Sequence, residues 1–180
     1  MATDVLAAVR AIPDPEIPVI TIEGLGILRG LTFDAAAGEV HVVITPTYSG
    51  CPAMRAIEDS IARVCRAHGL TARVTTQLAP AWTTDWIDAD SREALRRFGI
   101  APPGPAGSAG LGSSGGPVSV TLGTRPTAAS PGEAGTRHTP ACPRCGSERT
   151  SAPSQCGSTA CKALRRCDDC GDPFDEFKAL

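Results

Sequence analysis

Aromatic residues are scarce in this sequence. They make up 4% of its 180 residues, with one tyrosine and two tryptophans. Hydrophobic residues still account for 42% of the chain, so any core must be built mainly from aliphatic side chains. The chain contains no run of about 18 apolar residues, which excludes a membrane-spanning helix. The N-terminus also lacks a basic segment followed by an apolar run, so no secretory signal is expected.

An excess of charge is absent too. The formal net charge is −2, which gives no bulk attraction to nucleic acid or to an anionic membrane. We therefore expect a cytoplasmic protein that binds neither nucleic acid nor membranes. In that compartment the eight cysteines should be reduced thiols or metal ligands rather than disulfides.

Composition divides the chain into three parts. Residues 1–100 alternate apolar and polar side chains in an orderly way. Residues 101–139 are dominated by Pro, Gly, Ala, Ser and Thr, which cannot bury enough surface to offset their ordering entropy, so this stretch is predicted to be a flexible linker. Residues 140–180 hold six of the eight cysteines and form a second predicted domain.

Hydrophobic periodicity and turn residues predict six elements in the first part. In chain order they are a helix to about Ile12, strands over 26–34 and 38–47, a helix over 51–69, a strand over 70–78, and a helix over 88–100 capped at Asp90 or Ser91. The order α-β-β-α-β-α predicts a small α+β layer fold with helices packed against a sheet.

The stretch TPTYSGCPAM places Cys51 at the predicted start of a helix. Free N–H groups and the helix dipole there favour a thiolate, and Gly50 lets a ligand approach closely. A small residue that merely fills the loop–helix junction is an equal alternative. Cys65 falls on the apolar stripe of the same helix and is predicted to be a buried, inert thiol. His68 lies about 25 Å along that helix from Cys51, too far to act as the base of a cysteine hydrolase.

Two carboxylates in DPEIP, Asp14 and Glu16, are constrained by flanking prolines. They are candidate ligands or orienting groups near the Cys51 loop. An Asp-initiated turn is the alternative interpretation of this motif.

The third part carries a more specific signal. Two C-x2-C pairs, Cys142 with Cys145 and Cys167 with Cys170, are separated by 21 residues, close to zinc-ribbon spacing. Four thiolates on one Zn²⁺ form a closed structural site, which explains how some 40 residues with few large apolar side chains fold. Cys156 and Cys161 are left over as spare thiols, alternative ligands or part of an iron–sulfur site.

Several motifs together suggest a family. DPEIPVITIEGLG, VVITPTYSGCPAM and AWTTDWI resemble the small iron–sulfur assembly (SufT-like) domain. With CPRCGS, GSTACKALRRC and PFDEFK added, the whole chain outside the linker resembles the PaaD family. Members of that family are accessory components of the bacterial phenylacetyl-CoA 1,2-epoxidase system in aerobic phenylacetate degradation.

The resemblance implies a component of a multicomponent monooxygenase system that is not itself catalytic. It implies a part in maturing a metal or iron–sulfur centre of a partner, either oxygenase-complex subunits or their iron–sulfur reductase. A structural adaptor that binds oxygenase subunits without metal transfer is the alternative. The cofactors implied are a structural Zn²⁺ and a transient iron or cluster. Carried over by motif, the cofactor-binding residues are Cys51, Asp14 and Glu16, and the metal ligands are Cys142, Cys145, Cys167, Cys170 and Cys161.

Overall fold

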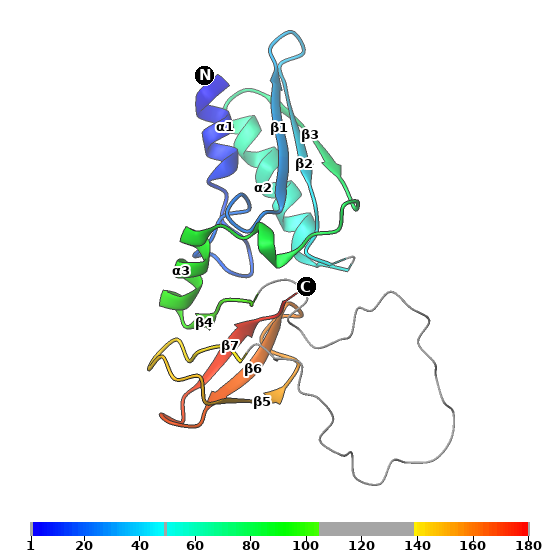
Figure 1. The fold of residues 1–180 in the computed structure, drawn as a ribbon. Helices are drawn as coiled ribbons and strands as arrows, with labels where there is room; N and C mark the ends of the chain where they lie inside the picture. The colour runs from blue at the N-terminus through cyan, green and yellow to red at the C-terminus, as the bar shows by residue number, and fades with distance from the viewer. Residues whose placement is uncertain (1, 49, 105–138, 180) are drawn as a thin grey trace, which may run out of the picture.

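The computed structural model describes residues 2–48, 50–104 and 139–179, which are arranged as two stacked units (Figure 1). We call residues 2–99 the N-terminal unit, and residues 100–104 with 139–179 the ribbon unit. Apart from its first four residues and its last, the linker predicted over 101–139 lies outside the described residues.

The N-terminal unit has the predicted element order, with one addition. Its elements are α1 (Ala2–Arg10), β1 (Leu28–Asp34), β2 (Glu39–Ile44), α2 (Ala53–Ala67), β3 (Thr71–Thr76), the 3-10 helix η1 (Thr84–Trp86) and α3 (Ala89–Phe98). Only η1 was not expected from the sequence. The predicted α+β layer fold is therefore confirmed.

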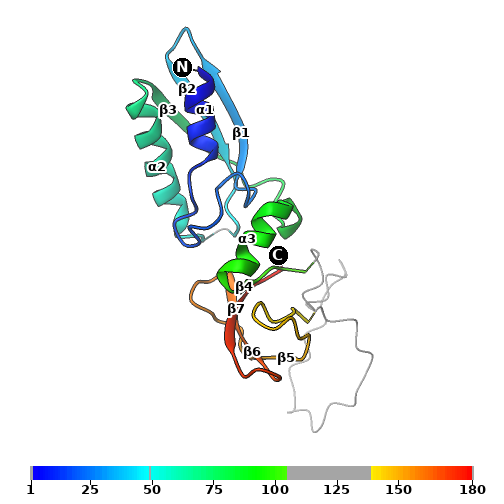
Figure 2. The same cartoon turned by 90° about the vertical axis from the view of Figure 1, so that its left-hand side faces the viewer.

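The N-terminal sheet has the strand order β1-β2-β3. β1 and β2 form the predicted antiparallel hairpin, and the Asp34 carboxylate accepts hydrogen bonds from the backbone of Ala36 and Ala37 in its turn. β3 runs parallel to β2, and α2 connects them. One face of β2 is buried at Val40, Val42 and Ile44 in a cluster shared with α1 and α2, so both helices cover that face (Figure 2).

Helix α2 buries one stripe of side chains spaced four residues apart. Ile57, Ile61 and Cys65 are each 0% exposed, which fits a helical period with one face on the core. The predicted buried, inert role of Cys65 is confirmed by this placement. Pro52 was expected as the first helical residue, but the structure places it at the N-cap, one residue earlier.

Helix α3 begins earlier than its predicted cap. Asp88, rather than Asp90 or Ser91, is the N-cap, and its carboxylate accepts a hydrogen bond from the Ser91 backbone. The reason is tertiary: the backbone N–H of Asp88 donates to the carbonyl of Gly24, 3.0 Å away, which fixes this residue before the helix starts. The sequence alone offers three equivalent capping residues here.

The ribbon unit is a four-stranded sheet with the order β4-β7-β6-β5. Its strands are β4 (Ile100–Ala101), β5 (Thr150–Ser154), β6 (Lys162–Cys167) and β7 (Pro173–Phe177). β4 pairs in parallel with β7, so the predicted domain boundary between residues 100 and 101 falls inside one strand and is corrected. A two-residue strand whose partner lies far along the chain leaves no local pattern in the sequence.

The two units share buried side chains. Phe177 of β7 and Cys161 belong to the same hydrophobic cluster as the core of the N-terminal unit. The rings of Phe177 and Trp82 have their centroids 6.0 Å apart. On the α3 side, the Arg92 guanidinium donates to the carbonyls of Thr84 and Pro103, which ties β4 to the N-terminal unit. The ribbon is thus docked on the first unit rather than merely tethered to it.

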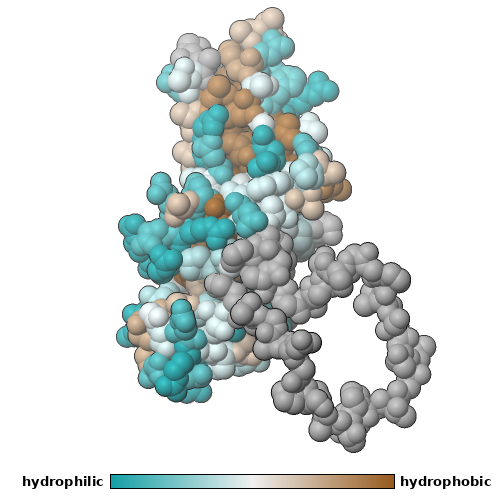
Figure 3. Space-filling model, viewed as in Figure 1, coloured by the Kyte–Doolittle hydropathy of each residue, from teal (hydrophilic) through white to brown (hydrophobic). Residues whose placement is uncertain are grey.

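Among the described residues, no helix is long and apolar enough to cross a membrane. In the view of Figure 3, hydrophilic residues cover much of α3 and the ribbon unit, and hydrophobic residues gather higher on the N-terminal unit. Large hydrophobic side chains that are exposed in the described residues are scattered: Val19, Leu78, Phe98 and Leu164.

Candidate metal centre

Four cysteines of the ribbon unit converge on one point. The sulfur atoms of Cys142, Cys145, Cys167 and Cys170 all lie within 4.8 Å of one another. The Cys142 and Cys170 sulfurs are 3.9 Å apart, and those of Cys145 and Cys167 are 3.5 Å apart. The two C-x2-C pairs identified in the sequence therefore come together, with each close pair joining one motif to the other.

The two cysteine turns repeat one backbone pattern. In the first, the Cys142 N–H donates to the Ser147 carbonyl and the Cys142 carbonyl accepts from Gly146. In the second, Cys167 makes the same two bonds, to Asp172 and from Gly171. Gly146 and Gly171 have φ values of 78° and 77°, a left-handed conformation in which a side chain is strained. The glycine directly after each second cysteine therefore shapes a tight turn that presents two sulfurs to one side.

The donor set fits Zn²⁺. In a tetrahedral site, Zn–S bonds of about 2.3 Å put the sulfur atoms roughly 3.8 Å from one another. The two sulfur separations of 3.5 and 3.9 Å bracket that value. Four protein ligands complete a tetrahedral shell and leave no open position, as in structural zinc sites.

The thiols of this tetrad need a cation to ionise together. A hydrogen bond from the Cys170 backbone N–H holds the pKa of Cys167 at about 7. At Cys145 a backbone hydrogen bond at Ser147 lowers the pKa, but the neighbouring sulfurs, foremost Cys167, outweigh it and raise the pKa to about 12. One thiolate thus forms readily and opposes the next, because like charges this close disfavour each other. A bound divalent cation removes that opposition.

Polar contacts hold the two cysteine turns against each other. The Arg144 guanidinium lies 2.8 Å from the Asp172 carboxylate, and Arg149 lies 3.0 Å from Asp169. The Ser147 hydroxyl also donates to Asp169. Each pair joins a residue near the first C-x2-C to one at the second, so these contacts fix the relative placement of the turns.

Cys161 was predicted as a ligand together with these four, but it does not join the tetrad. It lies at the start of β6, 6% exposed, in the cluster that forms the core of the N-terminal unit. Its thiol donates to the Glu16 carboxylate at 3.9 Å and lies 3.0 Å from the Thr159 hydroxyl. Burial raises the pKa of the Cys161 thiol, and the negative charge of Glu16 raises it further.

The DPEIP segment is a tight turn organised by Asp14. One carboxylate oxygen of Asp14 accepts hydrogen bonds from the backbone of Glu16 at 2.9 Å and of Ile17 at 2.8 Å. Asp14 is 4% exposed, and this burial raises the pKa of its carboxyl group. These contacts are those of an Asp-initiated turn, the alternative considered from the sequence. Asp14 thus positions Glu16, whose carboxylate reaches the ribbon unit.

Cys51 lies in the loop between β2 and α2. It precedes the N-cap Pro52, so it is one residue further from the helix than expected. Its backbone N–H donates to the Tyr48 carbonyl at 3.1 Å. Its side chain is partly buried against the N-terminal core without belonging to the fully buried set. This thiol is therefore accessible, in contrast to Cys65.

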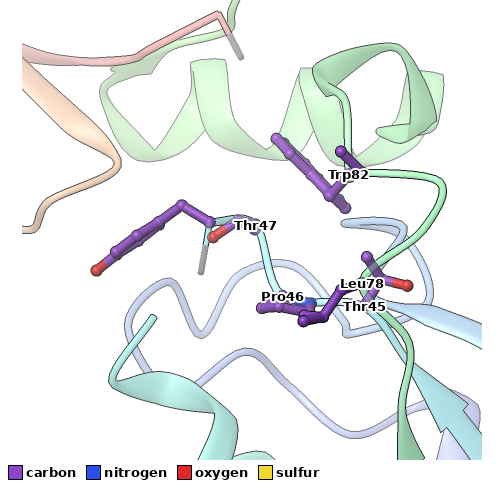
Figure 4. A pocket seen from close by; sticks show the side chains of 7 residues that line it. Thr45, Pro46, Thr47, Leu78 and Trp82 are labelled. Atoms are coloured by element: carbon purple, nitrogen blue, oxygen red, sulfur yellow. The ribbon is translucent and has the colours of Figure 1, made fainter. Parts of the chain in front are cut away.

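A small pocket opens beside this loop. It has a volume of about 170 Å³ and is lined by Thr45, Pro46, Thr47, Tyr48, Leu78, Ala81 and Trp82. Figure 4 shows Trp82 on one side of it and Pro46, Thr45 and Leu78 on the other. The Trp82 indole N–H donates to the Leu25 carbonyl at 3.0 Å, which fixes that wall. Ligand pockets for drug-sized molecules span roughly 300–1,000 Å³, so this one is too small for such a ligand.

Comparison with known proteins now separates the two units. A family model described as "Iron-sulfur cluster assembly protein" matches residues 2–76. A second, described as "PaaD zinc beta ribbon domain", matches residues 126–178. The chain is also 42% identical over 182 residues to a 1,2-phenylacetyl-CoA epoxidase subunit of Escherichia coli (strain K12), and the match covers 98% of this chain and 92% of that protein. The chain belongs to the PaaD family.

Two solved structures resemble the N-terminal half of this PaaD-family chain. A domain of unknown function, DUF59, from Bacillus anthracis is 23% identical and covers 52% of this chain and 90% of its own, with a TM-score of 0.47. The protein Rv1466 from Mycobacterium tuberculosis, described as associated with Fe-S complex assembly and repair, is 32% identical and covers 54% of this chain and 84% of its own, with a TM-score of 0.33.

The family resemblance predicted from the motifs is confirmed, and so is the four-cysteine cluster. The roles of Cys51, Asp14 and Glu16 stay predictions. Tyr48 is a residue that sequence reasoning missed. Desolvation raises the pKa of its phenol, and the charges of Cys51, Glu16 and Cys161 raise it further, so all three groups lie around this side chain. Its rarity was a usable signal, because it is the chain's one tyrosine and stands three residues before Cys51.

Proposed function

We propose that this protein is a non-catalytic accessory component of a phenylacetyl-CoA 1,2-epoxidase system that helps to load iron or an iron–sulfur cluster into a partner. The partner is an oxygenase subunit or the iron–sulfur reductase of that system. Support for the system comes from the 42% identity to the Escherichia coli epoxidase subunit. Support for the maturation role comes from the iron–sulfur assembly family model over residues 2–76. We place this activity in the cytoplasm, where thiols persist in reduced form.

The observation that carries the maturation role is the position of Cys51. Its thiol is partly accessible on a loop, and Glu16 lies near the same tyrosine. A metal that is to be handed on needs a site with few protein ligands and an open position. An accessible thiolate beside a carboxylate supplies such a site, whereas a completed tetrahedral shell does not.

The ribbon has a different role in this proposal. Its four thiolates would hold one Zn²⁺ permanently, and the ion would supply folding energy rather than chemistry. Cys142 and Cys167 are buried, at 2% and 0% exposure, so the site is closed on the protein side. Zinc retention and iron transfer are thus assigned to separate cysteines.

Catalysis by the chain itself has little support in the described residues. His41 lies 3.1 Å from the Glu39 carboxylate, and the His68 ring contacts the Val64 carbonyl at 2.9 Å. Both histidines have partners on their own element, and neither forms a nucleophile–base pair with a cysteine. The pocket beside Cys51, at about 170 Å³, is also too small for a coenzyme A ester.

A structural adaptor that grips oxygenase subunits without moving metal would need no accessible thiol. The experiment that separates the two functions is co-expression of the epoxidase system with the Cys51→Ser variant in cells that lack the native protein. We expect normal amounts of folded variant, with lower iron in the purified oxygenase and reductase subunits and lower epoxidation. Cys156→Ser is the matched control, because Cys156 is exposed and lies outside both cysteine groups. Unchanged partner iron with Cys51→Ser would favour the adaptor.

A further inference from the structure

Three metal-ligating groups from the two units lie around Tyr48. Glu16 and Cys51 come from the N-terminal unit, and Cys161 comes from the ribbon unit. Glu16 and Cys161 are 145 residues apart in sequence, yet the thiol and the carboxylate are 3.9 Å from each other. Docking of the ribbon therefore brings a second cysteine to the loop that carries the first.

The surroundings of Cys161 differ from those of a packing cysteine. Cys65 lies on the aliphatic stripe of α2, whereas Cys161 has the Glu16 carboxylate and the Thr159 hydroxyl against its sulfur. The next residue, Lys162, has a side chain only 7% exposed and lies 3.7 Å from the Asp175 carboxylate. A buried ammonium close to a buried thiol and a carboxylate is costly as packing and is more typical of a site that binds charge.

We propose that Cys51, Cys161 and Glu16 form one metal site shared between the two units, which takes a soft divalent cation such as Fe²⁺. This inference rests on the proposed function and deepens it by naming the second thiol. Two thiolates and one carboxylate suit iron, and three protein ligands leave a coordination position open for a partner's ligand. Binding forms two metal–sulfur bonds and releases the two thiol protons to solvent, with no change of oxidation state.

Neighbouring residues have positioning roles in this site. Asp14 holds the turn that presents Glu16, through its bonds to the backbone of Glu16 and Ile17. Lys162 supplies a positive charge that partly balances three anionic ligands around a divalent ion. Because the ligands come from both units, the complete site exists only while the ribbon is docked.

The test uses the full-length, zinc-loaded protein without oxygen and titrates it with Co²⁺ as a spectroscopic probe for Fe²⁺. Co²⁺ binds thiolate sites more weakly than Zn²⁺, so the ribbon should keep its zinc. We expect one further equivalent of Co²⁺ with thiolate-to-metal charge-transfer absorption. Cys51→Ser and Cys161→Ser should each remove about half of that absorption. Even second-shell changes weaken metal binding by about 10- to 100-fold, so Glu16→Gln, which removes a direct ligand, should weaken it by at least about tenfold.

Zinc content and melting temperature are measured for every variant, because Cys161 is buried and its replacement could disturb folding. Glu16→Gln leaves the buried core untouched and keeps the test decisive if Cys161→Ser is unstable. Cys156→Ser is the control and should bind Co²⁺ as the wild type does. The shared site is overturned if no second equivalent binds, or if folded Cys161→Ser and Glu16→Gln bind Co²⁺ as tightly as the control. In either case, loss of partner iron with Cys51→Ser in cells would still uphold the proposed function.

Discussion

The two units of this protein reach a folded state by different means. The N-terminal unit buries a cluster of aliphatic side chains from α1, α2 and its sheet, many of them below 2% exposure. The separate cluster of the ribbon unit contains only Ala101, Cys142, Cys167 and Phe174. Two of those four residues are metal ligands in our account. The first unit can be stabilised by hydrophobic burial, whereas the second needs a metal ion and a partner surface.

The same contrast applies to the cysteines. The ribbon gathers four sulfurs into a complete shell. The N-terminal unit leaves Cys51 partly accessible on a loop and receives Cys161 from the ribbon. Closure suits a structural ion and openness suits an ion in transit, so one short chain carries both kinds of thiol site without exchanging their ligands.

Removing a ribbon ligand should separate the two units most strongly. Cys145→Ser should lose its zinc and unfold the ribbon, because apparent zinc-binding energies of about 10–16 kcal/mol in small zinc domains are folding energy. Metal analysis with hydrogen exchange of β5, β6 and β7 checks this, and Cys156→Ser should keep both zinc and protection. A metal-free Cys145→Ser ribbon that stays fully protected would show that zinc is not what folds it.

The docking of the units can be weakened without touching the metal. Phe177→Ala removes the ring that packs on Trp82 within the shared core, and such truncations cost about 3–5 kcal/mol. We expect zinc to be retained while the whole protein unfolds at lower denaturant, followed by tryptophan fluorescence. Phe174→Ala is the matched variant, because Phe174 lies in the small ribbon cluster and should leave the Trp82 surroundings unchanged.

The turn that presents Glu16 offers a smaller effect. Asp14→Ala removes an acceptor used by two backbone N–H groups, and by analogy with helix caps this should cost about 1 kcal/mol. Asp14→Asn keeps a side-chain oxygen in the same place and removes a buried charge, so it should be less destabilising than the alanine variant. Urea unfolding of the two variants gives the difference directly. Equal losses would mean that the turn does not depend on this acceptor.

The smallest effect is on thiol reactivity rather than stability. In zinc-loaded protein, alkylation should be fastest at exposed Cys156, slower at partly buried Cys51 and slowest at Cys65. Burial raises the pKa of Cys65, which lowers its thiolate fraction further. Mass spectrometry of timed samples gives the order. Fast labelling of Cys65 would contradict its placement in the core of α2.

Much of the N-terminal fold could be predicted because its signals are local. The stripe of Ile57, Ile61 and Cys65 marks α2, and the alternation of Val40 and Val42 marks a half-buried strand. The cysteine tetrad was also predictable, since two C-x2-C pairs on repeated turns can be identified without knowledge of the fold. The α3 cap was not, because a bond from Asp88 to Gly24 decides among three adjacent candidates.

The features that sequence reasoning missed depend on contacts between distant segments. β4 exists because Ile100 and Ala101 meet Asp175 and Glu176, and no local pattern encodes that pairing. Cys161 was expected beside the ribbon cysteines because it lies between them in sequence. The β6 strand instead places it at its other end from Cys167, against Glu16 of the first unit. Proximity in sequence was a poor guide to proximity in space.

The central claim is that iron moves through the Cys51 loop while zinc stays in the ribbon. The most direct test loads the full-length protein with isotopically labelled Fe²⁺ without oxygen, mixes it with metal-free oxygenase and reductase subunits, and counts iron and zinc on each protein after separation. We predict that labelled iron passes to a partner, that zinc remains at one per chain, and that Cys51→Ser abolishes the transfer while Cys156→Ser does not. Zinc leaving with the iron, or equal transfer by Cys51→Ser, would contradict the account.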